Sequence, residues 1–358
     1  MEFIGKSLRL RIRGRYKKAP GLSAFLLISF MLLHPAQADE SIKVLMLDSP
    51  SNPLPSRQAE KIEDLKGKVF FNGQSYSGSI EVMRDENGLY VVNSLPFEKY
   101  IEGVVASEVG RNWNMEALKA QAVISRTYAV FNKNLNGEKN YHLTSSVLHQ
   151  VYKGENPDPL VTEAVTATEG EILTYQGKPV NALYHSTCEG KTELPEEVWA
   201  ESFPYLKSVE CNGKNTPYES WRKRFAFEEI NKALGMTGFK DIAVISITAT
   251  GRAKTLRIVY SSMNETNPSG MEIRATELRR LLGYKEMPST DFTVTRTDTE
   301  VIFDGKGYGH GVGLSQWGAL EMAREGKNYM EILSHYYPGT VITKDKGQMH
   351  SRNQGLEK

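Results

Sequence analysis

The chain has 358 residues, which is long enough for two ordinary domains or for one large domain with insertions. Charged residues make up 24% of it, and the formal net charge is +1. This balance argues against a nucleic-acid-binding protein, which would usually carry a basic stripe. Outside the N-terminus no long apolar run occurs, so we expect the body of the protein to be soluble.

The N-terminus has the three parts of a secretory signal peptide. Basic residues alternate within Arg9–Lys18, an apolar core follows at Ala24–Leu33, and Ala36-Gln37-Ala38 is a small-residue cleavage site. The apolar core is too short for a stable membrane-spanning helix. We therefore predict that residues 1–38 are a signal peptide cut after Ala38. The protein is then exported to the periplasm or the cell-wall space, and an uncleaved membrane anchor is the alternative.

The two cysteines, Cys188 and Cys211, are interpreted in this exported setting. An even pair in an exported protein favours a disulfide over a metal site. The alternative is a Cys188 thiol that acts as a nucleophile, with His185 three residues before it. Oxidising conditions favour the bridge over a free thiolate.

Residues 39–95 are predicted to form a small β platform. It begins with a strand at Ile42–Leu47, and a Pro/Ser-rich loop follows at Ser49–Ser56. Between Lys68 and Val92, Asn-Gly and Ser-Gly pairs separate short strands, as they do in hairpins. This platform leads directly into a helix.

That helix carries the most informative residue of the chain. Apolar residues at positions 97, 100, 101, 104 and 105 have the spacing of one buried helix face, and the next position of that stripe is Glu108. A carboxyl on an apolar face is taken out of water, which raises its pKa and keeps it protonated, as a general acid requires. Gly110 ends the helix and leaves Glu108 beside a loop. The alternative is that Glu108 lies at the rim of the face and pairs with a surface lysine.

A second helix is predicted from the N-cap Asn114 onward. Gln121 and Tyr128 share one polar stripe of this helix, and Arg126 lies on another. Such faces are often simply solvated. The short link between the two helices keeps the second one beside Glu108, so we expect Gln121 and Arg126 to reach a common cleft.

Two histidines, His142 and His149, lie in an irregular stretch after this helix. Their spacing of seven residues fits no standard zinc pair, and no cysteine lies nearby. We therefore do not expect a metal at this place.

A strand that follows ends in small polar groups around Gly190. A strand end of this kind is typical of a ligand-facing loop. The polar residues of this loop are His185, Ser186, Thr187, Lys191 and Thr192.

Residues 219–285 contain no pattern that indicates chemistry. Helices are predicted at Phe227–Leu234 and Ala275–Leu282, and strands at Ile242–Thr250 and Thr255–Tyr260. We interpret this region as a lobe or insertion that completes the core.

Glycine occurs at every second position from 305 to 313. In an extended chain this pattern bares one face of the backbone and puts Lys306, Tyr308, His310 and Val312 on the other. The pattern lacks the Lys-Ser/Thr of a phosphate-binding loop, so nucleotide binding is not expected. We predict one wall of a cleft here, followed by Ser315 and Gln316 at the start of the helix Leu314–Ala323; a simple glycine hinge is the alternative.

Three blocks of the sequence resemble the SpoIID/LytB family, which takes its name from stage II sporulation protein D and the amidase enhancer. The blocks are LPFEKYIEGVVASEVG with EALKAQAVISRTYA, then YHSTCEGKTELPEEVW with PYLKSV, and then GKGYGHGVGLSQWGA with the segment after it. The resemblance implies a mixed α+β fold with a SpoIID-like core, namely the small β platform, helices that carry the catalytic glutamate, and a second β-rich lobe. It implies a catalytic core at 96–342 with the lobe at about 219–285, and a flexible tail at 343–358.

In the sporulation members the resemblance implies a peptidoglycan lytic transglycosylase. The family's glutamate, in the pattern V-x-S-E, falls on Glu108, and its arginine, in A-x-x-x-R-T-Y-A, falls on Arg126. We expect Glu108, Arg126 and Lys191 to be catalytic. The expected substrate-binding residues are Gln121, Tyr128, His185, Ser186, Thr187, Lys306, Tyr308, His310, Ser315 and Gln316.

Two departures from the family pattern bear on the site. Some members carry Cys and His zinc ligands just before a Q-V-Y motif, but residues 144–149, before Gln150-Val151-Tyr152, contain no cysteine. That zinc is not carried over, and no cofactor is expected. The usual Gly-Gly after the HST segment is Glu189-Gly190 here, which adds a charge near the site.

The predicted reaction is non-hydrolytic cleavage of the MurNAc–GlcNAc β-1,4 bonds of peptidoglycan glycan strands, which gives 1,6-anhydroMurNAc ends. Glu108 acts first as acid and then as base. Neither nucleic acid nor nucleotide is an expected partner. The alternative is a non-catalytic peptidoglycan-binding module that stimulates a separate cell-wall amidase, in which Glu108 is a glycan contact or a structural residue.

Overall fold

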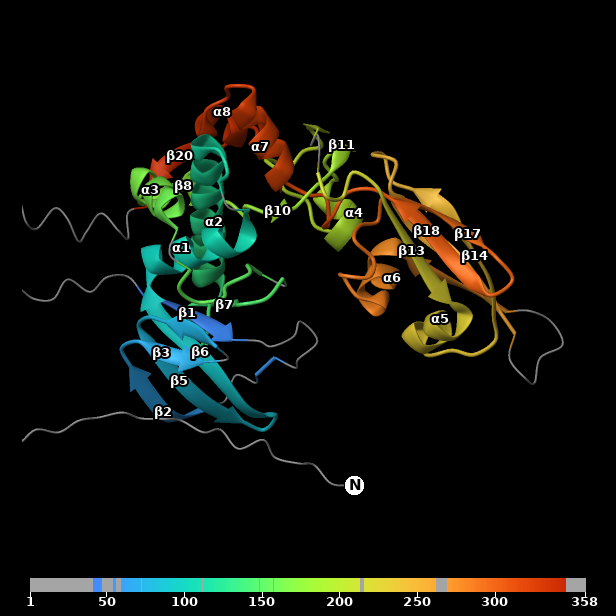
Figure 1. Cartoon of the computed structure of the whole chain (residues 1–358), viewed down its shortest axis with the longest axis horizontal. Helices are drawn as coiled ribbons and strands as arrows, with labels where there is room; N and C mark the ends of the chain where they lie inside the picture. Colours follow the sequence, from blue (N-terminus) through green and yellow to red (C-terminus); the bar gives the residue numbers. More distant parts are fainter. Residues whose placement is uncertain are drawn as a thin grey trace, which may run out of the picture. The chain divides into compact units, whose positions relative to one another are not determined.

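The computed structural model describes residues 41–46, 54–55, 59–71, 73–110, 112–147, 149–156, 158–212, 216–261 and 269–345 (Figure 1). All of them belong to the unit Ala38–Lys358. The predicted signal peptide, most of the Pro/Ser-rich loop and residues 346–358 of the predicted tail lie outside these ranges. Helices and several small sheets alternate along the described chain, which confirms the mixed α+β class. Within the described ranges, no helix has the length and apolar content needed to cross a bilayer.

The first sheet has the strand order β2-β5-β6-β1-β7. β5 and β6 form a hairpin whose register pairs Asp85 with Gly88, so the turn falls where the Asn-Gly pair predicts it. β1 pairs antiparallel with β6 and parallel with β7. The strands of this region are β1 (Ser41–Met46), β2 (Glu60–Lys66), β5 (Ser79–Asp85), β6 (Gly88–Pro96) and β7 (Leu143–Thr144), with β3 (Val69–Phe71) and β4 (Gln74–Tyr76) in a separate hairpin.

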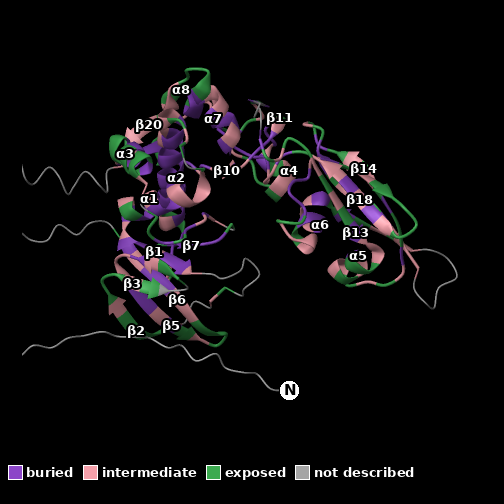
Figure 2. Cartoon of the chain, viewed as in Figure 1, coloured by how far each residue is buried: buried purple, intermediate pink, exposed green. Residues whose placement is uncertain are grey.

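Two consecutive helices, α1 (Phe97–Glu108) and α2 (Met115–Leu135), form the centre of the main core. The apolar stripe predicted for α1 is buried, and Val104 and Val105 are fully enclosed. α2 begins after the predicted N-cap Asn114, whose side chain accepts a hydrogen bond from a backbone N–H of the first turn. Figure 2 shows that α2 is buried along most of its length, so its polar residues face protein as well as its apolar ones.

Elements before and after the lobe complete the main core. Leu173 of β8, Leu320 of α7 and Ile332 of α8 belong to the same buried cluster as α1 and α2. The chain therefore returns to its starting core after it has formed the lobe. These elements are α3 (Pro159–Ala167), β8 (Glu171–Tyr175), β9 (Lys178–Pro179), α7 (Gln316–Arg324), α8 (Tyr329–Tyr336) and β20 (Val341–Lys344), and the sheet order is β20-β8-β9.

The lobe has a hydrophobic cluster of its own, which includes Phe225, Leu256, Leu278 and Phe303. The expectation that this region completes the main core is corrected: its apolar side chains bury one another, together with the strands that follow. Both predicted helices have the predicted bounds, α5 (Phe227–Leu234) and α6 (Ala275–Leu282). The sheets are β13-β18-β17 and β14-β15-β16, made of β13 (Trp221–Ala226), β14 (Phe239–Ile247), β15 (Ala253–Tyr260), β16 (Ser269–Arg274), β17 (Phe292–Arg296) and β18 (Glu300–Gly305).

Short segments between the main core and the lobe bring the polar strand end to the glycine-rich stretch. β10 (Tyr184–His185) pairs in parallel with β19 (Leu314–Ser315). An antiparallel pair of β11 (Glu189–Lys191) and β12 (Glu210–Asn212) follows, and a disulfide joins Cys188, just before β11, to Cys211 in β12 with a Cα–Cα distance of 6.1 Å. The short helix α4 (Pro195–Trp199) completes this region.

The glycine-rich stretch is not an extended strand, which corrects the face assignment made from its alternation. β18 ends at Gly305, and Gly307, Gly309, Gly311 and Gly313 all have positive φ, a conformation that favours glycine. A Cβ at Gly309 would lie 2.6 Å from the Cβ of His185. The glycines therefore let the loop turn and lie close against the polar strand end. We call residues 306–313 the glycine loop.

Removal of the disulfide is expected to weaken the fold. A Cys188→Ala/Cys211→Ala variant should lose about 3 kcal/mol of unfolding free energy, because the bridge spans a sequence separation of 23 residues and restricts the unfolded chain. Urea denaturation of the oxidised wild type and of the double variant measures this difference. Reductant should lower the midpoint of the wild type and leave that of the variant unchanged; equal midpoints for oxidised and reduced wild type would contradict the prediction.

Candidate active site

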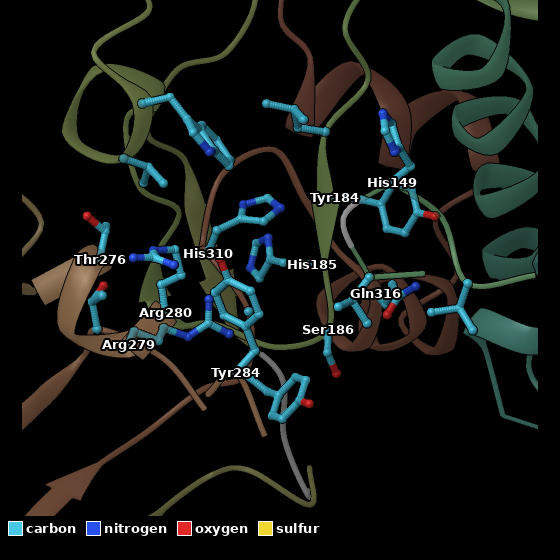
Figure 3. A pocket seen from close by; sticks show the side chains of 18 of the residues that line it. His149, Tyr184, His185, Ser186, Thr276, Arg279, Arg280, Tyr284, His310 and Gln316 are labelled. Carbon is cyan, nitrogen blue, oxygen red and sulfur yellow. The ribbon is translucent and has the colours of Figure 1, made fainter. Parts of the chain in front are cut away.

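A cavity of about 590 Å³ contains Glu108 and is lined by both the main core and the lobe. The helix α6 supplies one wall, whereas Glu108, Tyr184 and Gln316 belong to the other. In Figure 3, His185 and His310 lie between these two groups. Of the residues predicted from sequence, those that line the cavity are Glu108, Tyr128, His185, Ser186, Tyr308, His310 and Gln316.

Glu108 is the last residue of α1 and is half-buried. Its Oε1 accepts hydrogen bonds from the Val151 backbone N–H at 2.7 Å and from the Tyr184 hydroxyl at 3.2 Å. The side chain of Gln316 approaches Oε2 at a longer 3.4 Å. Burial raises the pKa of Glu108, and these three donors offset only part of that effect. Because Oε1 already accepts the two shorter hydrogen bonds, Oε2 is the oxygen that can carry the proton.

Buried amides support the donor Gln316. Its Nε2 also lies 3.4 Å from Oε1 of Gln121, and Gln121 Nε2 donates to the Ser125 hydroxyl at 3.1 Å. Gln121 itself does not line the cavity. Its position behind Gln316 makes it a residue that orients the amide next to Glu108.

The two central histidines are held in the neutral form. Nδ1 of His185 donates to the Val312 carbonyl at 3.1 Å, and Nδ1 of His310 accepts the Val312 N–H at 3.1 Å. Burial lowers the pKa of His185 well below its usual value, and burial together with the charge of Arg279 lowers the pKa of His310 to about 3. Neither ring can serve as a proton donor of imidazolium type at neutral pH.

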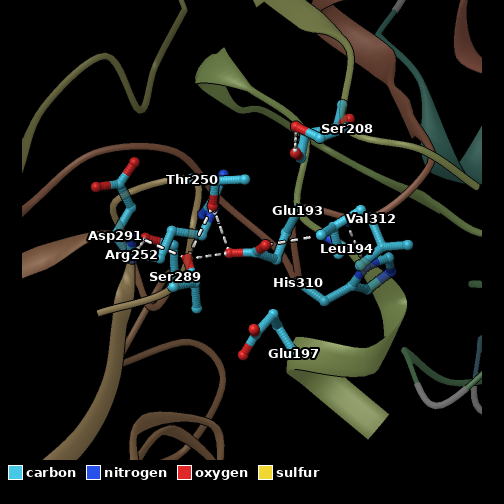
Figure 4. A network of polar contacts seen from close by, with 12 residues as sticks. Glu193, Leu194, Glu197, Ser208, Thr250, Arg252, Ser289, Asp291, His310 and Val312 are labelled. Atoms are coloured by element: carbon cyan, nitrogen blue, oxygen red, sulfur yellow. Dashed lines mark hydrogen bonds and ion pairs between the residues drawn. The ribbon is translucent and has the colours of Figure 1, made fainter. Parts of the chain in front are cut away.

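A buried polar network fixes the glycine loop to the lobe (Figure 4). The carboxylate of Glu193 accepts hydrogen bonds from the hydroxyls of Thr248 at 2.6 Å and Thr250 at 2.5 Å, and its backbone N–H donates to the Gly311 carbonyl at 2.8 Å. The guanidinium of Arg252 lies 3.9 Å from the same carboxylate and against Gly311. The lobe thereby positions the loop that carries His310, although the sequence of this region gave no sign of such a role.

The position of Arg126 corrects the expectation that it reaches the cleft. Arg126 is fully buried, and its Nε and Nη2 each donate to the Glu98 carboxylate at 2.8 Å. Nη1 donates to the Glu171 carbonyl at 3.0 Å. Because this side chain does not line the cavity, its contacts join the start of α1 to β8 and support the fold.

Four other predicted residues also lie outside the cavity wall. Lys191 is exposed and lies 3.6 Å from Glu210, and Lys306 is exposed and lies 3.9 Å from Asp291. Thr187 exchanges two backbone hydrogen bonds with Tyr308, at 2.9 and 3.0 Å. The Ser315 hydroxyl caps α7 by accepting the Gly318 N–H at 3.2 Å. Thr187 and Ser315 therefore hold backbone segments that carry cavity residues, and their own side chains do not line the cavity.

Among the described residues, neither His142 nor His149 belongs to a cluster of side chains that could hold a metal ion. Nδ1 of His142 accepts the Lys43 N–H at 3.1 Å, and Nδ1 of His149 lies 2.9 Å from the Thr144 hydroxyl. His149 does line the cavity, and burial lowers its pKa to about 4. His185, Cys188 and Cys211 do lie together, but the two sulfurs are joined to each other and offer no thiolates.

Several cavity residues were missed by the sequence interpretation. Tyr184 directly precedes His185 in the second block that resembles the family, so the sequence does place its hydroxyl next to an expected site residue. Trp199 is 43% exposed at the cavity, and its ring lies 4.9 Å from that of His310. Arg279 and Tyr284 come from α6 and the loop after it, a region in which the sequence showed no pattern that indicates chemistry.

Comparisons with known proteins agree with this architecture. The sequence model of the family described as stage II sporulation protein matches residues 85–175, which include α1, α2 and β8. A second model, described as a domain of unknown function (DUF8618), matches residues 194–313, which include the lobe and the glycine loop.

Whole-chain relatives extend the match. An uncharacterised protein of Brachyspira hyodysenteriae is 34% identical over 278 residues, which are 76% of this chain and 73% of the relative. Stage II sporulation protein D of Bacillus subtilis is 35% identical over 282 residues, 74% of this chain and 79% of the relative. The amidase enhancer of Bacillus subtilis is 29% identical over 290 residues, 68% of this chain and 40% of the relative. The chain belongs to the SpoIID/LytB family.

An Arg126→Met variant separates a structural role from a catalytic one. It should lose about 3 kcal/mol of unfolding free energy, because it removes a buried guanidinium from a partly buried ion pair and leaves backbone carbonyls without a donor. Urea denaturation measures this loss. The control Arg222→Gln breaks an exposed pair with Asp304 and should leave the unfolding free energy close to that of the wild type. An Arg126→Met protein with unchanged stability and no activity would contradict the structural role.

The raised pKa of Glu108 predicts a pH-dependent stability. Because the folded protein holds this proton more tightly than the unfolded chain, the resulting stability is complete below the ordinary carboxyl pKa and is lost as the pH rises through the folded-state pKa. A Glu108→Gln variant should therefore be more stable than the wild type at pH 7, and the difference should shrink toward about pH 4.

Urea denaturation between these pH values tests this expectation. The control Glu102→Gln changes a carboxylate on the same helix that pairs with Lys99, and it should show no gain at pH 7. A Glu108→Gln protein that is less stable than the wild type at pH 7 would contradict the burial of a protonated carboxyl.

Proposed function

We propose that the protein is a peptidoglycan lytic transglycosylase that cleaves MurNAc–GlcNAc β-1,4 bonds of glycan strands and leaves 1,6-anhydroMurNAc ends. The observation that carries this proposal is the Glu108 carboxyl, whose pKa is raised by burial and which lines a cavity large enough for sugars. Such a group can donate a proton at neutral pH. Membership of the SpoIID/LytB family supports the same conclusion.

Both steps of the reaction use the same carboxyl. In the first step, Glu108 gives its proton to the glycosidic oxygen while the bond between that oxygen and C1 of MurNAc breaks. In the second step, the 6-hydroxyl of the same MurNAc attacks C1, and the Glu108 carboxylate takes the hydroxyl proton. The ring closes, no water is consumed, and Glu108 is again protonated.

The neighbours of Glu108 suit this exchange of protonation states. The Val151 N–H and the Tyr184 hydroxyl donate to Oε1, and they stabilise the carboxylate that exists between the two steps. The neutral histidines His185 and His310 cannot replace Glu108 as acid. They and Tyr308 instead offer hydrogen-bonding and ring surfaces for the glycan.

A conventional glycosidase would need a second carboxylate at a set separation from the acid. The other carboxylates that line the cavity are Glu201 and Glu277. Glu277 is held by two contacts with Arg280, at 2.6 and 2.8 Å, on α6. The pair with Arg280 argues against Glu277 as that second carboxylate.

The name of one relative supports a second candidate function. The amidase enhancer shares 29% identity with this chain. In that case the protein binds peptidoglycan and stimulates a separate cell-wall amidase, and the cavity holds sugar without cleaving it.

Further parts of the proposal concern export and organisation. We propose that residues 1–38 are a cleaved signal peptide, because peptidoglycan lies outside the inner membrane. Residues 39–95 form the platform and 96–344 the catalytic core with its lobe, because β20 continues to Lys344, past the expected bound of 342. Mass spectrometry of the N-terminus of the exported protein tests the cleavage site after Ala38.

A glycan digest tests the reaction. Purified wild type incubated with glycan strands should release anhydro-muropeptides, and Glu108→Gln should reduce their rate of formation by about 100-fold or more, because it removes the acid. Mass spectrometry of the products measures this change. Glu102→Gln, on the same helix but paired with Lys99 at the surface, should retain the wild-type rate.

Two results would count against the proposal. Equal anhydro-product yields from wild type and Glu108→Gln would remove Glu108 as the acid. Absence of products, together with strand binding and faster hydrolysis by an added cell-wall amidase, would establish the second candidate function.

A further inference from the structure

Arg279 is a buried cation in the cavity wall that the proposed reaction does not use. It lies on α6, only 9% of its surface is exposed, and it lines the cavity. Figure 3 shows it beside Arg280 and Tyr284, on the side of the cavity away from Tyr184 and Gln316. A charge this far from water requires compensating contacts.

The protein contacts of Arg279 are all with neutral groups. Nε donates to the Met287 carbonyl at 2.8 Å, and Nη2 donates to the Pro288 carbonyl at 2.9 Å. The guanidinium carbon lies 4.8 Å from the centre of the Tyr284 ring. Within the described part of the chain, no carboxylate forms an ion pair with Arg279, whereas its neighbour Arg280 has Glu277.

The surroundings of Arg279 are also poor in negative charge. The nearby His185 and His310 are neutral, and a second buried arginine, Arg252, lies close enough to add positive charge. Burial lowers the pKa of Arg279 to about 10, so the guanidinium remains charged at neutral pH. The protein thus holds a cation at the cavity with its charge uncompensated.

The geometry leaves one edge of the guanidinium for a ligand. Two of its five N–H groups serve the carbonyls of Met287 and Pro288, and both N–H groups of Nη1 together with one of Nη2 remain. The edge formed by Nη1 and Nη2 matches the two oxygens of a carboxylate.

We propose that Arg279 binds a carboxylate of the glycan strand in the cavity. This inference rests on the proposed function, since it takes peptidoglycan as the ligand. Two carboxylates are available there: the lactyl group of MurNAc, which is free when no stem peptide is attached, and the carboxylates of the stem peptide itself. Arg279 then determines which strands bind and places the sugar that carries this group next to Glu108.

Three ligands decide between these sources, with binding measured by calorimetry in the Glu108→Gln protein so that no cleavage occurs. The ligands are strands with free lactyl carboxylates, the same strands with each lactyl carboxylate converted to its methylamide, and strands with intact stem peptides. If the lactyl group is bound, the free-acid strands should bind about 10-fold or more tightly than the other two. If a stem-peptide carboxylate is bound, the peptide-bearing strands should bind most tightly by a similar factor.

An Arg279→Gln substitution should abolish the preference found in this series. The control Arg222→Gln removes the same charge from an exposed site of the lobe and should preserve it. If Arg279→Gln does not fold, the three ligands still decide the matter in the Glu108→Gln protein. Affinities that agree within about 3-fold for all three ligands, or a preference that survives Arg279→Gln, would overturn the inference.

Failure of this inference is distinguishable from failure of the proposed function. A wild-type protein that releases anhydro-products but binds all three ligands equally retains the function and loses the role of Arg279. A protein that binds carboxylate-bearing strands through Arg279 but releases no products retains the role of Arg279 and loses the reaction.

Discussion

Exclusion of water from one carboxyl is the constraint on which the site depends. The apolar stripe of α1 places Glu108 against the core, and the 151 backbone, Tyr184 and Gln316 close around it. The contact with Gln316 joins residues that are 208 positions apart in the sequence. A carboxyl in solvent would be ionised at neutral pH, so the raised pKa of Glu108 depends on the tertiary structure that assembles around it.

The residues that hold Glu108 and the glycine loop in place differ from Glu108 in their contacts. The buried Arg126 pairs with the half-buried Glu98 and joins α1 to the rest of the core, and Gln121 orients the amide of Gln316. Glu193 and Arg252 hold the glycine loop to the lobe in a comparable way. Arg126, Gln121, Glu193 and Arg252 are buried and polar, as a catalytic residue often is, yet their partners are protein groups. Burial and charge alone therefore do not identify a catalytic residue, and its contacts must be known as well.

Sequence periodicity predicted the local structure well and the long-range contacts poorly. The helix around Glu108 was predictable because a period of 3.6 residues reports on one face of one element. Arg126 was assigned to the cleft because its stripe is visible in the sequence, but nothing there indicates that Glu98 covers it. The glycine alternation could not distinguish an extended strand from a loop of positive φ, because glycine can adopt either conformation. Arg279 gave no signal at all, because its carbonyl partners lie in a loop with no recognisable pattern.

The hydrophobic cluster of the lobe is separate from that of α1 and α2, yet both regions face one cavity. The two family matches divide the chain in a similar way, at residues 85–175 and 194–313. Substitutions inside the lobe can then alter the α6 wall while the acid-bearing helix keeps its packing. A chimaera that exchanges only this region with a relative would therefore change the α6 wall of the cavity, while Glu108 and the groups that donate to it would stay in place.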